Sequence, residues 1–240
     1  MYKKTIGKKD LEHHLLTKFI SNECLGLRIK SITATETPDF IIHELSKTIS
    51  IELTRLIHPK LIKAEAFQEK LVESVHKRFK ENYSANLRVL VNFSKVPIKC
   101  KEREVSKYVQ ELYELVENIY LPNHKYNFNI SSKNNSKSLN HFIDFISVSN
   151  NSNFENWQPF GAFRVDEINF DWLTKVIIEK EKNIIKYKTL SNENWLLLLA
   201  NFGHKSSAHT FNSIQIDKLV TKFDKVYLYK DMDNTILQIK

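Results

Sequence analysis

The segment TISIELT, residues 48–54, alternates apolar and polar side chains without interruption, a pattern that fits a β-strand with one apolar and one polar face. The isoleucines and the leucine share one face, so Glu52 and Thr54 project together from the other. The preceding run DFIIHEL, residues 39–45, is also rich in strand formers, and the polar stretch between the runs has the length of a hairpin connection. The sequence therefore predicts that Asp39 and Glu52 lie on neighbouring antiparallel strands.

Hydrophobic periodicity predicts helices and strands along the rest of the chain. Helical spacing is found in 8–20, 60–82, 102–120 and 169–190, and strands are expected at 27–36, 87–94, 141–149, 158–166, 194–202 and 222–231. The continuous apolar run 87–94 is typical of a central strand covered on both sides. The asparagine-rich stretch 123–140 predicts a loop or an insertion. Because no repeat and no Pro/Gly linker interrupts the pattern, we expect a single α/β domain over residues 1–240, with a mixed sheet flanked by helices.

The scarcity of glycine excludes several common sites. The four glycines, at positions 7, 26, 161 and 203, do not form a glycine-rich phosphate loop or a dinucleotide fingerprint. The nine histidines are scattered without a zinc-ligand pattern, and Cys24 and Cys100 are expected to be free thiols. No apolar run is long enough to span a bilayer, and the N-terminal segment lacks the apolar stretch of a signal peptide. We therefore expect a cytoplasmic protein with no membrane partner.

The chain is basic, with a formal net charge of +8 and a sequence pI of about 9.2. A basic balance favours an anionic partner, of which nucleic acid is the default. A second interpretation stays open, because Lys, Asn, Ile, Phe and Tyr are abundant and all have AT-rich codons. Genome composition alone could therefore raise the lysine content of a protein with no nucleic-acid role.

The carboxylates of Asp39 and Glu52 are the candidates for chemistry. Two acids that converge on adjacent strands form an oxygen-rich site suited to Mg²⁺, and their mutual repulsion requires a cation or a proton. A divalent ion at such a site can hold a phosphodiester and activate a bound water. The alternative is structural, with Asp39 as a turn residue after Pro38 and Glu52 as an exposed strand residue.

Pro38-Asp39, followed after a short gap by Glu52-Leu53-Thr54, resembles the PD-(D/E)XK nuclease superfamily of restriction and repair nucleases. The family pattern is Pro-Asp at one strand, then an acid, any residue and a lysine on the next strand. The family core also runs in the order helix, strand, Asp strand, acid strand, long helix and central strand. The resemblance covers about residues 8–95 and implies a restriction-endonuclease-like α/β core, which about 100–240 would extend.

The resemblance implies roles for individual residues. Asp39 and Glu52 would bind Mg²⁺ or Mn²⁺ together with the Leu53 carbonyl. Gln68, in the helix expected after the acid strand, would position water or substrate. Some members carry a Glu in the first helix, for which Glu12 is the candidate and Glu23 and Glu36 are rivals.

Thr54 stands where the family has its lysine. That lysine would orient the attacking water and offset charge on the phosphate, and a threonine carries no positive charge. Lys63 or Lys70 could reach the site instead, with Thr54 helping to position water. The alternative is a catalytically inactive member of the fold that binds nucleic acid or a protein partner.

Lysines are dense between Lys175 and Lys188. They could contact phosphates, Lys182 and Lys186 among them, with Tyr187 and Trp195 as stacking groups; a solvated helix surface is the alternative. The resemblance implies a nuclease that acts on DNA, with RNA as an alternative and a homodimer as a suitable assembly for cutting two strands.

Overall fold

The computed structural model describes residues 7–94, 102–133, 141–152, 154–161, 165–200, 205–211 and 219–240. Contacts divide the chain into two compact units, where the sequence analysis expected a single domain. Unit 1 consists of Met1–His58 and Val165–Lys240, and unit 2 of Pro59–Arg164. Each unit has its own sheet, and together they make the fold α/β with mixed sheets and flanking helices, as expected.

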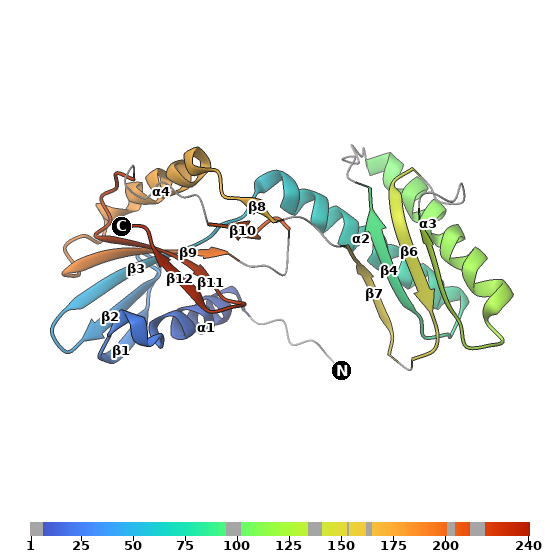
Figure 1. The fold of residues 1–240 in the computed structure, drawn as a ribbon, viewed down its shortest axis with the longest axis horizontal. Helices are drawn as coiled ribbons and strands as arrows, with labels where there is room; N and C mark the ends of the chain where they lie inside the picture. The colour runs from blue at the N-terminus through green and yellow to red at the C-terminus, as the bar shows by residue number, and fades with distance from the viewer. Residues whose placement is uncertain are drawn as a thin grey trace. The chain divides into compact units, whose positions relative to one another are not determined.

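Unit 1 is built on a sheet of six strands (Figure 1). In spatial order the strands are β1 (Ile29–Ala34), β2 (Phe40–Glu44), β3 (Thr48–Arg55), β9 (Glu193–Ala200), β11 (Lys225–Lys230) and β12 (Thr235–Gln238). The first three strands form an antiparallel meander, β3 and β11 both pair with β9 in parallel, and β12 pairs with β11 antiparallel.

The two faces of this sheet are covered by different helices. Helix α1 (Lys8–Ile20) packs on the face that carries Ile49, Ile51 and Leu53 of β3. Helix α4 (Phe170–Ile184) packs on the other face, against Leu196 and Leu198 of β9. Since the side chains of a strand alternate between faces, Glu52 and Thr54 share one face of β3, as predicted, and α4 covers that face. The short 3₁₀ helix η1 (Glu23–Leu25) and the parallel pair β8 (Asp166–Glu167) and β10 (His209–Thr210) complete unit 1.

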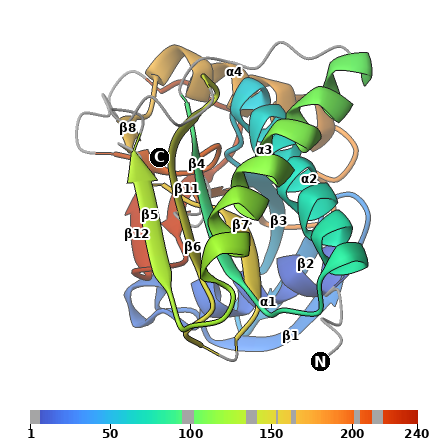
Figure 2. The same ribbon diagram turned by 90° about the vertical axis from the view of Figure 1, so that its right-hand side faces the viewer.

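Unit 2 is a four-stranded sheet packed against two helices that run side by side (Figure 2). Its spatial order is β5 (Asn129–Lys133), β6 (Ile143–Ser149), β4 (Arg88–Phe93) and β7 (Asn156–Pro159), and its helices are α2 (Pro59–Asn82) and α3 (Glu102–Asn123). Part of the stretch 123–140, expected to be a loop, forms β5; residues 134–140 lie outside the described residues. The strand expected at 158–166 coincides with β7 and β8 at its two ends, and residues 162–164 between them lie outside the described residues.

The predicted topology of the core is wrong at its last two elements. The strand at 88–93 does not continue the sheet of β3; it belongs to the sheet of unit 2, and β9 lies beside β3 instead. Two long helices lie between β3 and β9 in the sequence. Of these, α4 packs on the sheet that contains both strands, whereas α2 packs against α3 and β7 in unit 2. Unit 2 is therefore an insertion between β3 and α4. In the part of the chain that the structure covers, no helix combines the length and apolar character that crossing a membrane requires.

Candidate functional site

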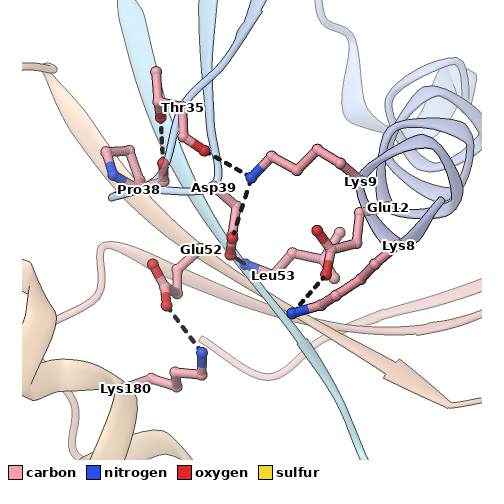
Figure 3. A network of polar contacts seen from close by, with 9 residues as sticks. All are labelled: Lys8, Lys9, Glu12, Thr35, Pro38, Asp39, Glu52, Leu53 and Lys180. Carbon is pink, nitrogen blue, oxygen red and sulfur yellow. Dashed lines mark hydrogen bonds and ion pairs between the residues drawn. The ribbon is translucent and has the colours of Figure 1, made fainter.

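Asp39 is held at the start of β2 by a direct link to β3 (Figure 3). Its Oδ2 accepts a hydrogen bond from the backbone N–H of Leu53, at 2.8 Å. Its Oδ1 lies 3.8 Å from Nζ of Lys9, which also donates to the Thr35 carbonyl at 2.6 Å. Helix α1 thus places an ammonium group beside the carboxylate, and the hairpin brings Asp39 to the residue that follows Glu52.

Glu52 is a buried acid, 5% exposed, on the middle of β3. Its Oε1 accepts a hydrogen bond from Nζ of Lys180, which reaches it from α4 at 3.0 Å (Figure 3). Burial raises the pKa of Glu52 above its usual range, against the opposing effect of Lys180, and the negative charge of Asp39 raises it further. The two acids are thus close enough to repel each other, as the hairpin predicts.

Lys180 occupies a core-facing position of α4. The buried residues of this helix are Leu173, Ile177 and Ile184, and a residue three positions after Ile177 and four before Ile184 falls on the same stripe. A lysine in an apolar stripe needs a charged partner, which Glu52 supplies from the facing strand. From the sequence, Lys180 is one of the lysines expected on the surface between Lys175 and Lys188, and its pairing with Glu52 is not predicted. The break that it makes in the apolar stripe of α4 is the signal that indicates a buried partner.

Thr54 points to the same side as Glu52 but contributes no charge. Its Oγ1 is buried and has no hydrogen-bond partner among the described residues. It therefore stays a predicted water-positioning residue, with a hydroxyl available for that purpose. The Leu53 N–H is engaged by Asp39, and the role of its carbonyl as a metal ligand also stays a prediction.

Tyr187 and Trp195 are not stacking groups, because their side chains are 0% and 1% exposed. The aromatic bodies of both residues pack in the two cores of unit 1, where a base cannot reach them. The hydroxyl of Tyr187 nevertheless has no hydrogen-bond partner among the described residues. Burial raises the pKa of Tyr187, and the negative charges of Glu52 and then Asp39 raise it further, so this hydroxyl lies in the electrostatic field of the acid pair.

Replacing Tyr187 with phenylalanine is expected to raise the free energy of unfolding by about 1 kcal/mol, because it removes a buried hydroxyl that makes no hydrogen bond. The matched control is Tyr229→Phe, since Tyr229 is equally buried but donates to Oδ1 of Asn234 at 3.0 Å. This control is expected to lose about 1 kcal/mol. Urea unfolding checks both variants, and a loss of stability in Tyr187→Phe would contradict the prediction.

The exposed lysines in the last turn of α4 and in the turn that follows it have local partners. Lys182 forms an ion pair with Glu179, and Nζ of Lys186 donates to Oδ1 of Asn183 at 3.2 Å. Both lysines are exposed, so contact with a phosphate strand stays a prediction for them.

The remaining predicted residues lie on helices other than α4 or in loops of the chain. Glu12 is 8% exposed on α1 and lies 3.6 Å from Nζ of Lys8, while its rivals Glu23 and Glu36 are exposed. Three others, Gln68, Lys63 and Lys70, lie on α2 in unit 2, so they do not occupy the helix that covers β3. Their roles at the site stay predictions.

The acids fit a Mg²⁺ ion that substrate helps to bind, and they do not form a complete protein cage. Among the described residues, no group of three or more His, Cys, Asp or Glu side chains is arranged to hold a metal. Proteins commonly bind Mg²⁺ through only one or two carboxylates together with substrate phosphates. Asp39 and Glu52 provide two carboxylates whose repulsion a cation would relieve. Two carboxylates alone are therefore expected to bind Mg²⁺ weakly.

Comparisons of the chain with protein-family models, with curated proteins and with solved structures find no match.

Proposed function

We propose that this chain is a divalent-metal-dependent nuclease that hydrolyses phosphodiester bonds in DNA, with RNA as the alternative substrate. One observation carries the proposal: Nζ of Lys180 lies 3.0 Å from Glu52, the acid that the resemblance assigns to the metal. An ammonium group at this acid is what the family motif supplies from the position that Thr54 occupies here. Lys180 would replace the missing lysine from a different element.

The arrangement of unit 1 supports this proposal. Without the inserted residues 59–164, its helices and strands up to β9 run α1, β1, β2, β3, β8, α4 and β9, and the two-residue strand β8 lies outside the six-stranded sheet. The resemblance implies the order of a helix, three strands that carry the Asp and the acid, a helix and a central strand. Helix α4 and strand β9 take the place of the helix and strand that the resemblance expects within about residues 8–95.

In the proposed reaction, Asp39 and Glu52 would hold the ion, which would supply a bound water of lowered pKa and positive charge beside the phosphate. The Leu53 N–H keeps the Asp39 carboxylate oriented toward β3. Lys180 donates a hydrogen bond to a phosphate oxygen or to the attacking water and stabilises the negative charge that develops. Lys9, whose side chain is 40% exposed, is placed to contact the neighbouring phosphate. By the family resemblance, the products would carry a 3′-hydroxyl and a 5′-phosphate.

A second candidate is a non-catalytic module that binds nucleic acid or a protein. The observation in its favour is that each acid already faces an ammonium group, Lys9 for Asp39 and Lys180 for Glu52. A site neutralised by lysines is stable without a metal, as expected of a fold that has lost its chemistry.

Incubation of supercoiled and linear DNA with Mg²⁺ or Mn²⁺ separates the two candidates. The nuclease proposal predicts metal-dependent cutting that an Asp39→Ala/Glu52→Ala variant loses. Salt-sensitive binding without cutting would support the module instead. Binding to no polyanion at any salt concentration would contradict both nucleic-acid proposals. The cytoplasmic location and the homodimer stay predictions.

A further inference from the structure

The position that a metal would take on Glu52 is already in contact with a cation of the protein. Oε1 of Glu52 lies 3.0 Å from Nζ of Lys180, and the side chains of the pair are 6% and 30% exposed, respectively. Asp39 also forms an ion pair, but a longer one, with its Oδ1 at 3.8 Å from Nζ of Lys9. Glu52 is therefore tightly paired and Asp39 only loosely.

An ammonium group and a divalent ion compete for such a carboxylate. Mg²⁺ binds oxygen ligands at about 2.1 Å, so both cations on one oxygen would be brought into close repulsion. A metal on Oε1 must displace Lys180, and the free energy of the buried ion pair is then subtracted from metal binding at that oxygen. A metal that binds without substrate is opposed by this pair.

Only one member of the pair is free to leave. Glu52 is fixed on β3, between β2 and β9, with its side chain enclosed. Lys180 has a flexible four-carbon stem, and its partly exposed ammonium can reach an anion in solvent. A phosphodiester beside the acids offers that ammonium a new negative partner at the moment when the metal needs Glu52.

We propose that Lys180 is a substrate-released latch: it holds Glu52 while the site is empty and transfers to the substrate phosphate, so that the metal and the phosphodiester bind cooperatively. The inference rests on the proposed function and adds a regulatory step to it. Linkage requires the coupling to be reciprocal, so the metal must strengthen phosphodiester binding by the same factor.

Mn²⁺ binding, followed by electron paramagnetic resonance and calorimetry, tests the latch. The probe of substrate is a short oligonucleotide with phosphorothioate linkages, which keep the negative charge. Without the oligonucleotide, Lys180→Met is expected to bind Mn²⁺ about tenfold more tightly than the wild-type chain does. The oligonucleotide is expected to tighten Mn²⁺ binding about tenfold in the wild type and little in Lys180→Met, within the usual range of coupling between sites.

Controls separate competition from general effects. Lys175→Met removes an exposed charge from the same helix and is expected to leave Mn²⁺ affinity unchanged. Glu52→Gln/Lys180→Met removes both partners and is expected to lose the affinity gained by Lys180→Met. Circular dichroism confirms folding, and Lys180→Gln replaces Lys180→Met in the same assays if the latter does not fold.

The latch is overturned if removing Lys180 leaves Mn²⁺ affinity unchanged, if neither protein binds Mn²⁺, or if the oligonucleotide acts equally on both proteins. These results are independent of DNA cutting. Cutting by the wild type with no gain in Lys180→Met removes the latch and leaves the nuclease. Higher Mn²⁺ affinity in Lys180→Met with no DNA cutting by the wild type would contradict the nuclease proposal and support competition between Lys180 and the metal for Glu52.

Discussion

Glu52→Gln is expected to lower metal-dependent cleavage at least about 100-fold while leaving the free energy of unfolding unchanged or about 1 kcal/mol higher. The amide keeps the shape of the side chain but cannot supply the negative charge that a metal requires. The folded protein, in turn, loses a buried charge. Because burial raises the pKa of Glu52, ionised Glu52 opposes folding, and stability falls as the pH rises through that raised pKa. Any stability gain of the variant is therefore present at neutral pH and absent in acid.

Glu193→Gln is the matched control on β9. Oε1 of Glu193 lies 2.6 Å from Nζ of Lys47, and its Oε2 accepts from the Trp195 indole at 2.7 Å, so this acid has structural partners. The control is expected to lose stability and to retain cleavage. Chemical denaturation and a gel-based cleavage assay measure the two properties. Unchanged cleavage in Glu52→Gln would contradict the assignment of this acid.

Lys180→Met is expected to lower the free energy of unfolding by about 3 kcal/mol at pH 8, because it leaves the buried Glu52 carboxylate without its counter-charge. Removing the ammonium raises the pKa of Glu52 further, since Lys180 is the larger of the two influences that lower this pKa, the other being a hydrogen bond with Asn183. The carboxyl then protonates as the pH falls, so the deficit relative to wild type is largest above the raised pKa and shrinks below it.

Urea unfolding between pH 4.5 and pH 8 measures this effect. The stability of Lys180→Met is compared with that of the double variant Glu52→Gln/Lys180→Met. The double variant has no unpaired buried charge, so it is expected to regain most of the lost stability. A deficit in Lys180→Met that does not change with pH, or that persists in the double variant, would show that Lys180 acts through packing alone.

Local elements were predictable because each depends on a short repeating pattern. The helix expected at 8–20 is α1 with the same bounds, and the alternation in 48–54 is β3, which is buried on both faces from Ile49 to Leu53. Long-range pairing could not be predicted in the same way. The apolar run of β4 and that of β9 are equally suited to a central strand, and nothing within either segment indicates which one lies beside β3.

In the candidate site, too, local features were predictable from the sequence and long-range contacts were not. Asp39 and Glu52 were found because the motif that contains them is local to one hairpin. Their partner Lys180 lies 128 positions from Glu52, beyond the whole inserted unit, so no motif search over neighbouring strands reaches it. Burial was also misjudged at Tyr187 and Trp195, because an aromatic residue near lysines resembles a stacking group unless the core beneath it is known.

Anomalous diffraction from crystals grown with Mn²⁺ and a phosphorothioate oligonucleotide tests the central claim most directly. The account predicts a manganese peak bound by the carboxylates of Asp39 and Glu52, with Nζ of Lys180 moved from Glu52 to the phosphate. An intact Glu52–Lys180 pair at saturating Mn²⁺ and oligonucleotide, with no peak beside Asp39, would contradict it.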